Sequence, residues 1–210
     1  MSGARRRLVD DLRGKGIADT AVLGAIAQTP RHAFVPSGVA HRAYEDSALP
    51  IGSGQTISQP FIHARSLELL QAAGRDRVLE VGTGSGYQTA LLARLAGHVY
   101  SVERVPELHE RAAASLRAVG VTNVSLACAD GTEGWPAHAP YDGIIVGAGS
   151  PEVPLPLAGQ LAQGGRLVVP VGGRDEQRLV LIERQGNQLL RSEFDLVRFV
   201  PLVGAHGWEP

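Results

Sequence analysis

An acidic residue and three glycines at alternate positions form the first group with a recognisable chemistry: Glu80, Gly82, Gly84 and Gly86. Because glycine has no Cβ atom, its backbone adopts positive φ angles and lets a ligand approach the main chain closely. Residues 78–81, which are apolar apart from Glu80, are typical of the end of a parallel strand that is buried on both faces. The apolar residues 90–93 and 95 fit a helix whose first N–H groups face the ligand. This stretch therefore predicts a strand, a turn and a helix that bind a cofactor.

The order of the glycines distinguishes two classes of cofactor. A dinucleotide-binding turn has the order G-x-G-x-x-G, whereas Tyr87 stands here in the place of the third glycine. The pattern E-x-G-x-G-x-G instead resembles motif I of the class I S-adenosylmethionine-dependent methyltransferases. The resemblance implies S-adenosylmethionine as cofactor, held by Glu80, Gly82, Thr83, Gly84, Ser85 and Gly86. An ordinary glycine-rich turn in an α/β domain is the alternative.

Two further acidic residues follow apolar segments. Glu103 closes an apolar strand at 98–102, twenty-one residues after the first glycine of the motif. A carboxylate at this point can accept hydrogen bonds from both ribose hydroxyls, as in dinucleotide-binding folds. Asp130 and Gly131 end the next apolar strand, at 124–127, and Asp130 is placed to accept a hydrogen bond from the adenine amino group.

These segments belong to a regular alternation of strands and helices, which predicts a doubly wound α/β fold. We expect a mostly parallel sheet with helices on both faces, the Rossmann-like fold of class I methyltransferases. The expected strands are residues 78–81, 98–102, 124–127, 141–146 and 166–171, with a hairpin at 177–184 and 188–195. The expected helices are residues 19–28, 58–73, 90–95, 106–119 and 155–161, the first capped by Asp19 or Thr20.

The segment 44–60 has many turn-forming residues and no steady hydrophobic period, which predicts an ordered loop with a functional role. Ser58 is a candidate N-cap for the helix that follows, with Pro60 near its first turn. Because this helix leads directly into the strand of motif I, Ser58 and the glycine turn could end close together.

Composition limits the classes of protein to which the chain can belong. With 210 residues, 44% of them hydrophobic and 20% charged, it has the size of one domain with a substantial core. The net charge of −1 gives no electrostatic case for a nucleic-acid partner. No apolar run reaches the roughly 18 residues of a membrane span, and residues 5–11 lack the apolar core of a signal sequence. We therefore expect no membrane partner and a cytoplasmic location.

The cysteine and histidine content predicts neither a disulfide nor a metal site. Cys128 is the single cysteine, so an intrachain disulfide is excluded, and its place in an apolar strand predicts a small core residue. No group of histidines and cysteines has metal-ligand spacing, so we expect no metal.

Segments spread over most of the chain resemble the protein-L-isoaspartate O-methyltransferase family. They are residues 44–46 (Y-E-D), 49–52 (L-P-I-G), 55–60 (Q-T-I-S-Q-P), motif I up to residue 89, and 197–202 (V-R-F-V-P-L). The resemblance implies methyl transfer to the free α-carboxylate of isoaspartyl residues in damaged proteins and peptides. It also implies Ser58 as the catalytic residue and a substrate site formed by Ile57, Ser58, His63 and Val200. We expect a monomer, and a single domain over residues 1–210 in which residues 1–60 cover the substrate side.

The reaction requires no general base, because a carboxylate with a pKa of about 4 is already ionised at neutral pH. Both charges disappear as the bond forms, so the site has to align oxygen, methyl carbon and sulfur within about 3 to 3.5 Å. A hydroxyl donor meets this need. The resemblance therefore gives Ser58 the role of orienting one carboxylate oxygen, and a plain helix N-cap is the alternative.

One segment departs from the family pattern, which usually has a threonine and alanines there: Gly147, Ala148, Gly149 and Ser150. Two added glycines predict a more permissive loop under the methionine end of the cofactor, with an effect on rate or substrate range. Two other functions stay open. One is a class I methyltransferase that acts on a small molecule or on RNA, and the other is a non-catalytic S-adenosylmethionine-binding protein.

Overall fold

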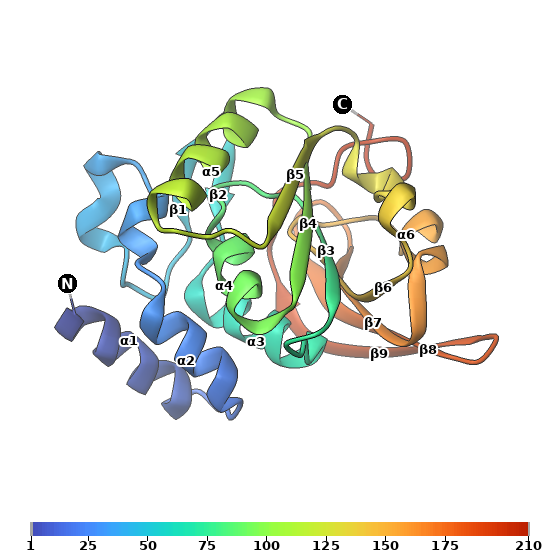
Figure 1. Ribbon diagram of the computed structural model, residues 1–210, viewed down its shortest axis with the longest axis horizontal. Helices are drawn as coiled ribbons and strands as arrows, with labels where there is room; N and C mark the ends of the chain where they lie inside the picture. The colour runs from blue at the N-terminus through green and yellow to red at the C-terminus, as the bar shows by residue number, and fades with distance from the viewer. Residues whose placement is uncertain (1, 210) are drawn as a thin grey trace.

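A seven-stranded sheet forms the centre of the computed structural model, which describes residues 2–209 (Figure 1). The ends of the predicted domain, residues 1 and 210, lie outside this range. The strand order is β5-β4-β3-β6-β7-β8-β9, in which neighbours from β5 to β7 pair in parallel and the pairs β7–β8 and β8–β9 are antiparallel. The strands are β3 (Arg77–Val81), β4 (His98–Glu103), β5 (Val124–Cys128), β6 (Tyr141–Val146), β7 (Leu161–Gly172), β8 (Gln177–Gln185) and β9 (Gln188–Val197). The predicted doubly wound, mostly parallel sheet is confirmed.

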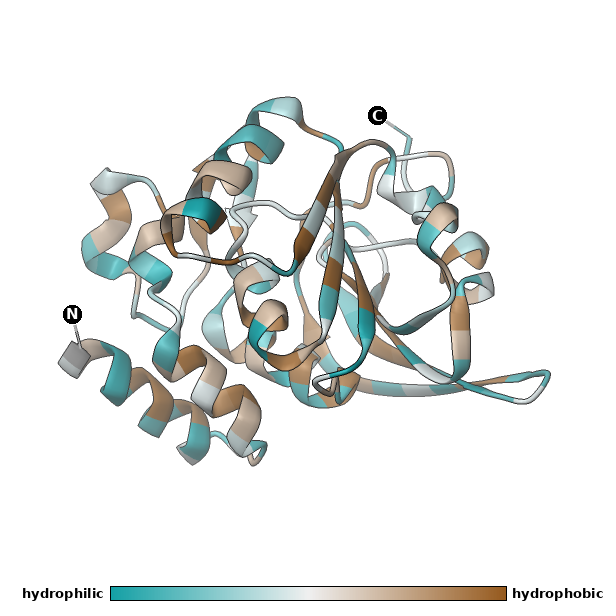
Figure 2. Ribbon diagram, viewed as in Figure 1, coloured by the Kyte–Doolittle hydropathy of each residue, from teal (hydrophilic) through white to brown (hydrophobic). Residues whose placement is uncertain are grey.

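Helices cover both faces of this sheet because successive side chains of a strand point to opposite sides. One core contains Val78, Val99, Ile145 and Val168 together with apolar side chains of the helices α1 to α5. The other contains Leu79, Val81, Ile144 and Leu167 together with α6. The helices are α1 (Ser2–Gly14), α2 (Thr20–Gln28), α3 (Pro60–Leu70), α4 (Tyr87–Leu95), α5 (Pro106–Ala118) and α6 (Leu155–Gly159). Figure 2 shows that α1 and α5 carry both hydrophobic and hydrophilic residues, as expected of helices with one buried side.

The order of the strands reverses beside β3, and this reversal positions the site. The chain passes from β3 to β4 and β5 on one side, and then crosses to β6 and β7 on the other. The carboxyl ends of β3 and β6 therefore lie side by side, and Gly147 N donates to Val81 O at 2.8 Å. Ligands of open α/β sheets bind at such a switch point.

The predicted ordered loop contains a small antiparallel sheet that the sequence analysis did not predict. Strands β1 (Leu49–Gly52) and β2 (Gln55–Ile57) pair through a tight turn at Ser53 and Gly54, whose φ angles are 51° and 69°. Positive φ at both central residues is typical of a two-residue hairpin turn. Before the hairpin, two short 3₁₀ helices, η1 (Arg31–Phe34) and η2 (Ser37–Arg42), continue the chain from α2.

Several predicted helix ends are wrong, although Asp19 does cap α2 through bonds to the backbone N–H groups of residues 21 and 22. Helix α3 begins at Pro60, so that Gln59 rather than Ser58 is at the N-cap position. It ends before Gln71, which has a left-handed φ of 55°. Helix α6 ends at Gly159, and Leu161 already belongs to β7.

Cys128 is exposed, and its prediction as a core residue is wrong. It lies at the end of β5, which is the edge strand of the sheet and has only partly buried residues before it. Within the described residues, no helix has the length and apolar character needed to cross a membrane.

Candidate active site

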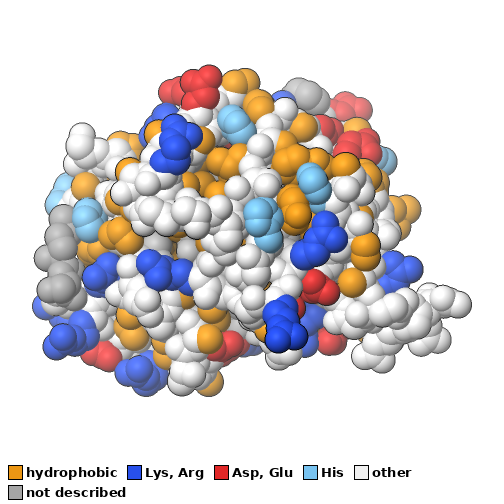
Figure 3. All heavy atoms as spheres, viewed as in Figure 1, with side chains coloured by type: hydrophobic (Ala, Val, Ile, Leu, Met, Phe, Trp, Pro, Cys, Tyr) orange, Lys and Arg blue, Asp and Glu red, His pale blue; other side chains and the backbone are white. Residues whose placement is uncertain are grey.

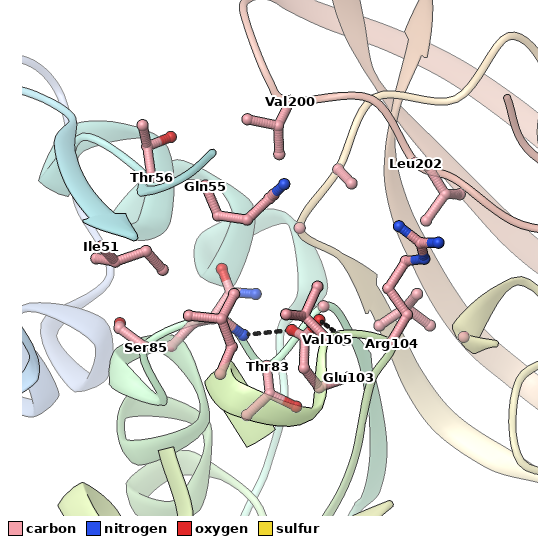
Figure 4. A pocket seen from close by; sticks show the side chains of 18 of the residues that line it. Ile51, Gln55, Thr56, Thr83, Ser85, Glu103, Arg104, Val105, Val200 and Leu202 are labelled. Atoms are coloured by element: carbon pink, nitrogen blue, oxygen red, sulfur yellow. Dashed lines mark hydrogen bonds between the residues drawn. The ribbon is translucent and has the colours of Figure 1, made fainter. Parts of the chain in front are cut away.

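A cavity opens at the carboxyl ends of β3 and β4, and motif I forms its floor (Figure 4). It contains about 870 Å³ of empty space, including its open mouth. The hairpin β1–β2 covers one side, and Val200 and Leu202 of the C-terminal segment cover the other. The predicted site residues that line it are Ile57, Ser58, His63, Gly82, Thr83, Gly84, Ser85, Glu103, Gly131 and Val200. Glu80, Gly86 and Asp130 are outside its lining.

The glycine-rich turn depends on its glycines at each alternate position. Gly82, Gly84 and Gly86 have φ angles of 90°, 54° and 85°, which strain any residue with a Cβ atom. Gly86 is also the N-cap residue of α4, and a Cβ there would lie 3.3 Å from Cβ of Ala112. The turn therefore brings its backbone directly to the cavity wall.

Glu103 is fixed against this turn by both of its carboxylate oxygens. Oε2 accepts from Gly84 N at 2.8 Å, and Oε1 accepts from Val105 N at 2.9 Å (Figure 4). The residue is only 5% exposed, yet its side chain forms part of the cavity wall. Because each carboxylate oxygen has two lone pairs, both can accept a further bond from a ligand hydroxyl.

Glu80 lies behind the cavity wall and supports the turn indirectly. Its Oε2 accepts from Thr89 Oγ1 at 2.5 Å and from Ser101 Oγ at 2.6 Å. Ser101 Oγ is also 2.6 Å from Thr83 Oγ1, so the buried carboxylate is linked to motif I. Complete burial raises the pKa of Glu80 to about 7, although hydrogen bonds from Ser101, Thr89 and Gln88 oppose the shift. Thr83 thus stands between Glu80 and the cavity.

His63 is a neutral, buried histidine at the cavity wall. Burial lowers its pKa to about 4, and Nδ1 lies 2.9 Å from Gln88 Oε1. An amide oxygen only accepts, so Nδ1 carries the proton and Nε2 is an acceptor. Nε2 is buried and has no hydrogen-bond partner among residues 2–209. A donor from a ligand in the cavity would satisfy it.

Ser58 lies between β2 and α3, at the edge where the cavity meets a wider groove. The prediction of a helix cap is wrong, because Asp46 Oδ1 accepts from Phe61 N at 2.8 Å and so caps the helix from a distant position. The Ser58 carbonyl accepts from Arg31 Nη2 at 2.9 Å. Its hydroxyl makes no hydrogen bond within the described part of the chain, so it is available to a ligand.

Asp130 is bound mainly by its own chain. Oδ1 accepts from the backbone N–H and the hydroxyl of Thr132 at 2.9 and 2.7 Å, and Oδ2 accepts from Ala205 N at 2.7 Å. The side chain borders a shallow depression beside the main cavity. Gly131 does line the cavity, and a Cβ there would lie 2.6 Å from Cγ1 of Val81.

The glycines of the segment 147–150 lie in close contact with other parts of the chain, and the predicted effect of this segment on rate or substrate range stays a prediction. Gly149 N donates to Val200 O and Leu202 N donates to Gly149 O, both at 2.8 Å. A Cβ on Gly149 would lie 2.8 Å from Cδ of Gln177. The segment is thus fixed between β6 and the C-terminal segment.

Some cavity residues were not predicted as site residues: Ile51, Gln55, Thr56, Gln88, Val105 and Leu202. Several of them belong to the segments that resemble the family, and this resemblance was the signal from which they could have been predicted as site residues. The neighbouring groove shares Thr56, Ser58 and Val200 with the cavity and has Arg174 and Arg198 on its rim. Within residues 2–209 no three His, Cys, Asp or Glu side chains gather as a metal site requires.

Comparison with known proteins gives consistent results. Residues 3–207 match the model of the protein-L-isoaspartate(D-aspartate) O-methyltransferase family. A protein-L-isoaspartate O-methyltransferase of Methanoregula boonei is 54% identical over 209 residues, which cover 99% of this chain and 96% of the relative. One of Azoarcus is 54% identical over 202 residues, or 95% of this chain and 93% of the relative.

Solved structures have the same fold. A protein-L-isoaspartate O-methyltransferase superposes with a TM-score of 0.88 at 32% identity, over 97% of this chain and 67% of that chain. A Plasmodium falciparum chain described by the same activity, and crystallised with S-adenosyl-L-homocysteine, gives a TM-score of 0.84 at 26% identity, over 95% and 98%. With a family match over nearly its whole length, this chain belongs to the protein-L-isoaspartate(D-aspartate) O-methyltransferase family.

Proposed function

We propose that this protein is a repair methyltransferase that transfers a methyl group from S-adenosylmethionine to the α-carboxylate of L-isoaspartyl residues in damaged proteins and peptides. Family membership supports the activity and the cofactor. The observation that carries the assignment of the site is the position of Ser58. Its hydroxyl makes no hydrogen bond within residues 2–209, and the residue borders both the cavity over motif I and the open groove.

The cavity fits S-adenosylmethionine, which supplies an electrophilic methyl group on a sulfonium ion. Glu103 would accept from the ribose hydroxyls, since its orientation is already fixed by Gly84 and Val105. The positive-φ turn leaves the main chain open to the ligand. We assign Glu80 an indirect part in this binding, through the Ser101 and Thr83 hydroxyls. For Asp130 we propose an additional bond to the adenine amino group, beside those it makes to Thr132 and Ala205, with Gly131 leaving space for the ring.

Two polar groups at the cavity would hold the substrate. Ser58 donates its hydroxyl hydrogen to one oxygen of the ionised substrate carboxylate and leaves the other free to attack. His63 accepts through Nε2 from a backbone N–H of the substrate, because that nitrogen is an unpaired acceptor. Ile57 and Val200 exclude water from the reacting atoms, which strengthens both bonds. No residue has to take up a proton, which agrees with a neutral His63.

The groove beside Ser58 would take the polypeptide on either side of the isoaspartyl residue. It is lined by Thr56 of the hairpin and by residues 196–201, among others, and it is open to solvent.

We also propose that residues 1–60 cover the substrate side of a single domain. We propose that the protein acts as a cytoplasmic monomer without a membrane or nucleic-acid partner. Basic side chains gather near α1 and are otherwise mixed with acidic and neutral ones in the view of Figure 3. An RNA substrate is disfavoured by the net charge of −1.

The test compares Ser58→Ala and Ser58→Thr with the wild-type protein. Because the hydroxyl caps no helix, Ser58→Ala should keep its stability and its affinity for S-adenosylhomocysteine. It should lose about 1.5 to 3 kcal/mol of transition-state stabilisation, the usual contribution of a hydrogen bond to a charged group. Ser58→Thr should recover part of this loss. An alanine variant with wild-type kcat/KM on an isoaspartyl peptide would overturn the assigned role.

A further inference from the structure

Arg31 is a completely buried arginine that forms no ion pair with any described residue. It is 0% exposed and lies at the start of η1, in the segment between α2 and the hairpin. Burial lowers the pKa of its guanidinium, against the attraction of Tyr87, Asp46 and Tyr44. Arginine remains protonated in proteins, so a positive charge is enclosed here. Buried charges are rarely kept without a specific partner. Here the two Nη groups have backbone carbonyls as partners, whereas Nε has no hydrogen-bond partner among residues 2–209.

The guanidinium donates to backbone carbonyls from three points along the same segment. Nη1 donates to Ala43 O at 2.7 Å, and Nη2 donates to Ser47 O at 3.3 Å and to Ser58 O at 2.9 Å. Its carbon lies 5.7 Å from the ring centre of Tyr87, the first residue of α4. One side chain thus joins both ends of the segment 43–58 to the helix that follows motif I.

These bonds fix the Ser58 carbonyl, and Asp46 fixes the chain that follows it. Oδ1 of Asp46 accepts from Phe61 N at 2.8 Å, and Oδ2 accepts from Gln59 Nε2 at 3.1 Å. The Ser58 carbonyl, the Gln59 side chain and the Phe61 backbone are therefore held, while the Ser58 hydroxyl makes no hydrogen bond within residues 2–209. Since Cα and Cβ follow the backbone, the direction of the hydroxyl depends on where the carbonyl is held.

We propose that Arg31 is a positioning residue for methyl transfer, which fixes the Ser58 carbonyl and so directs the Ser58 hydroxyl toward the substrate carboxylate. This inference rests on the role proposed above for Ser58. The planar fork of arginine matches several carbonyls at once, whereas the lysine ammonium is a single point of charge. Arg31→Lys keeps the charge and loses this geometry.

A double-mutant cycle separates positioning from general support of the fold. The four proteins are the wild type, Arg31→Lys, Ser58→Ala and the double variant, assayed on an isoaspartyl peptide and by binding of S-adenosylhomocysteine. Asn123→Ala is the matched control, because Asn123 Nδ2 also donates to three carbonyls, those of Ala93, Ala96 and Gly97. None of these four control residues lines the cavity.

We expect Arg31→Lys to lower kcat/KM for the peptide by about 10- to 100-fold, since small misplacements in a site have effects of this size. Cofactor affinity should stay within about twofold, because the motif I turn makes its own bonds. In the Ser58→Ala background the same change should lower kcat/KM by no more than about twofold, because interacting residues are non-additive. Asn123→Ala should lower the melting temperature and leave kcat/KM for the peptide unchanged.

An equal loss from Arg31→Lys in both backgrounds would overturn the inference and leave the role of Ser58 intact. Full activity of Ser58→Ala would contradict the role of Ser58, and the inference with it. Arg31→Gln provides a second variant in case the lysine does not fold. Parallel loss of peptide methylation and of S-adenosylhomocysteine binding in every folded Arg31 variant would make Arg31 a general support of the fold, and would also overturn the proposal.

Discussion

Two buried groups, Glu80 and His63, should give the stability of this protein two opposing dependences on pH. Burial raises the pKa of Glu80 from 4.5 to about 7 and lowers the pKa of His63 from 6.5 to about 4. The folded state therefore keeps a proton on Glu80 at pH values where the unfolded chain has lost it. Between about pH 4 and 6.5, His63 is protonated in the unfolded chain and neutral in the folded state.

The sign of each change of stability with pH depends on whether the folded or the unfolded state binds more protons. The stabilising contribution of Glu80 is fully present below pH 4.5 and is lost as the pH rises to about 7. That of His63 is fully present above pH 6.5 and is lost as the pH falls to about 4. At about 1.36 kcal/mol per pH unit, each group contributes about 3 kcal/mol. Between pH 4.5 and 6.5 the two contributions change with pH in opposite directions at nearly the same rate, so their sum in the wild-type protein stays nearly constant.

Replacing either residue should reveal the pH dependence of stability that the other residue produces. Between pH 4.5 and 6.5, the free energy of unfolding of Glu80→Gln should rise relative to wild type by about 3 kcal/mol, and that of His63→Gln should fall by a similar amount. Urea unfolding at closely spaced pH values measures both slopes. Glu152→Gln, which neutralises an exposed carboxylate, is the control and should follow the wild-type curve. A Glu80→Gln curve parallel to the wild-type curve would refute the argument from burial.

Two more predictions concern the cofactor cavity. Glu103→Ala removes the proposed ribose acceptor and frees Gly84 N and Val105 N, so calorimetry should show S-adenosylhomocysteine binding weaker by about 1 to 3 kcal/mol, and unchanged affinity would contradict the assignment. Gly131→Ala places a Cβ 2.6 Å from Cγ1 of Val81 and should cost about 1 to 3 kcal/mol of stability by overpacking. Gly159→Ala, whose Cβ meets nothing within 4 Å, should leave the melting temperature unchanged, and equal effects of the two alanines would contradict this packing argument.

The parallel strands were predictable because burial on both faces leaves continuous apolar runs. Residues 144–146 are such a run, and residues 78–81 are one apart from Glu80; both belong to central strands. The hairpin β1–β2 was missed because its strands have four and three residues and include Pro50, which is too little for a hydrophobic period. The exposure of Cys128 was missed because no local pattern shows which strand lies at the edge of the sheet.

Tertiary contacts explain both why the predicted helix cap at Ser58 is wrong and why the hydrogen-bond partners of Asp46 and Asp130 were not predicted. Ser58 has the residue type and spacing of an N-cap, but Asp46, fifteen residues before Phe61, makes that bond instead. Asp130 follows its strand as a ligand-binding carboxylate would, yet Ala205 and Thr132 occupy its oxygens. Such partners are distant in sequence, so spacing identifies the candidate residues and leaves their contacts undetermined.

The central claim is tested most directly by methyl transfer from labelled S-adenosylmethionine to two peptides of identical sequence. One contains L-isoaspartate and the other L-aspartate at the same position. In the isoaspartyl peptide the main chain passes through the side-chain carbonyl, so the free carboxylate lies one methylene nearer to the backbone that the groove would hold. The account predicts rapid methylation of the isoaspartyl peptide and little of the aspartyl peptide. Equal rates for the two peptides, or methylation of neither by a protein that binds S-adenosylhomocysteine, would contradict it.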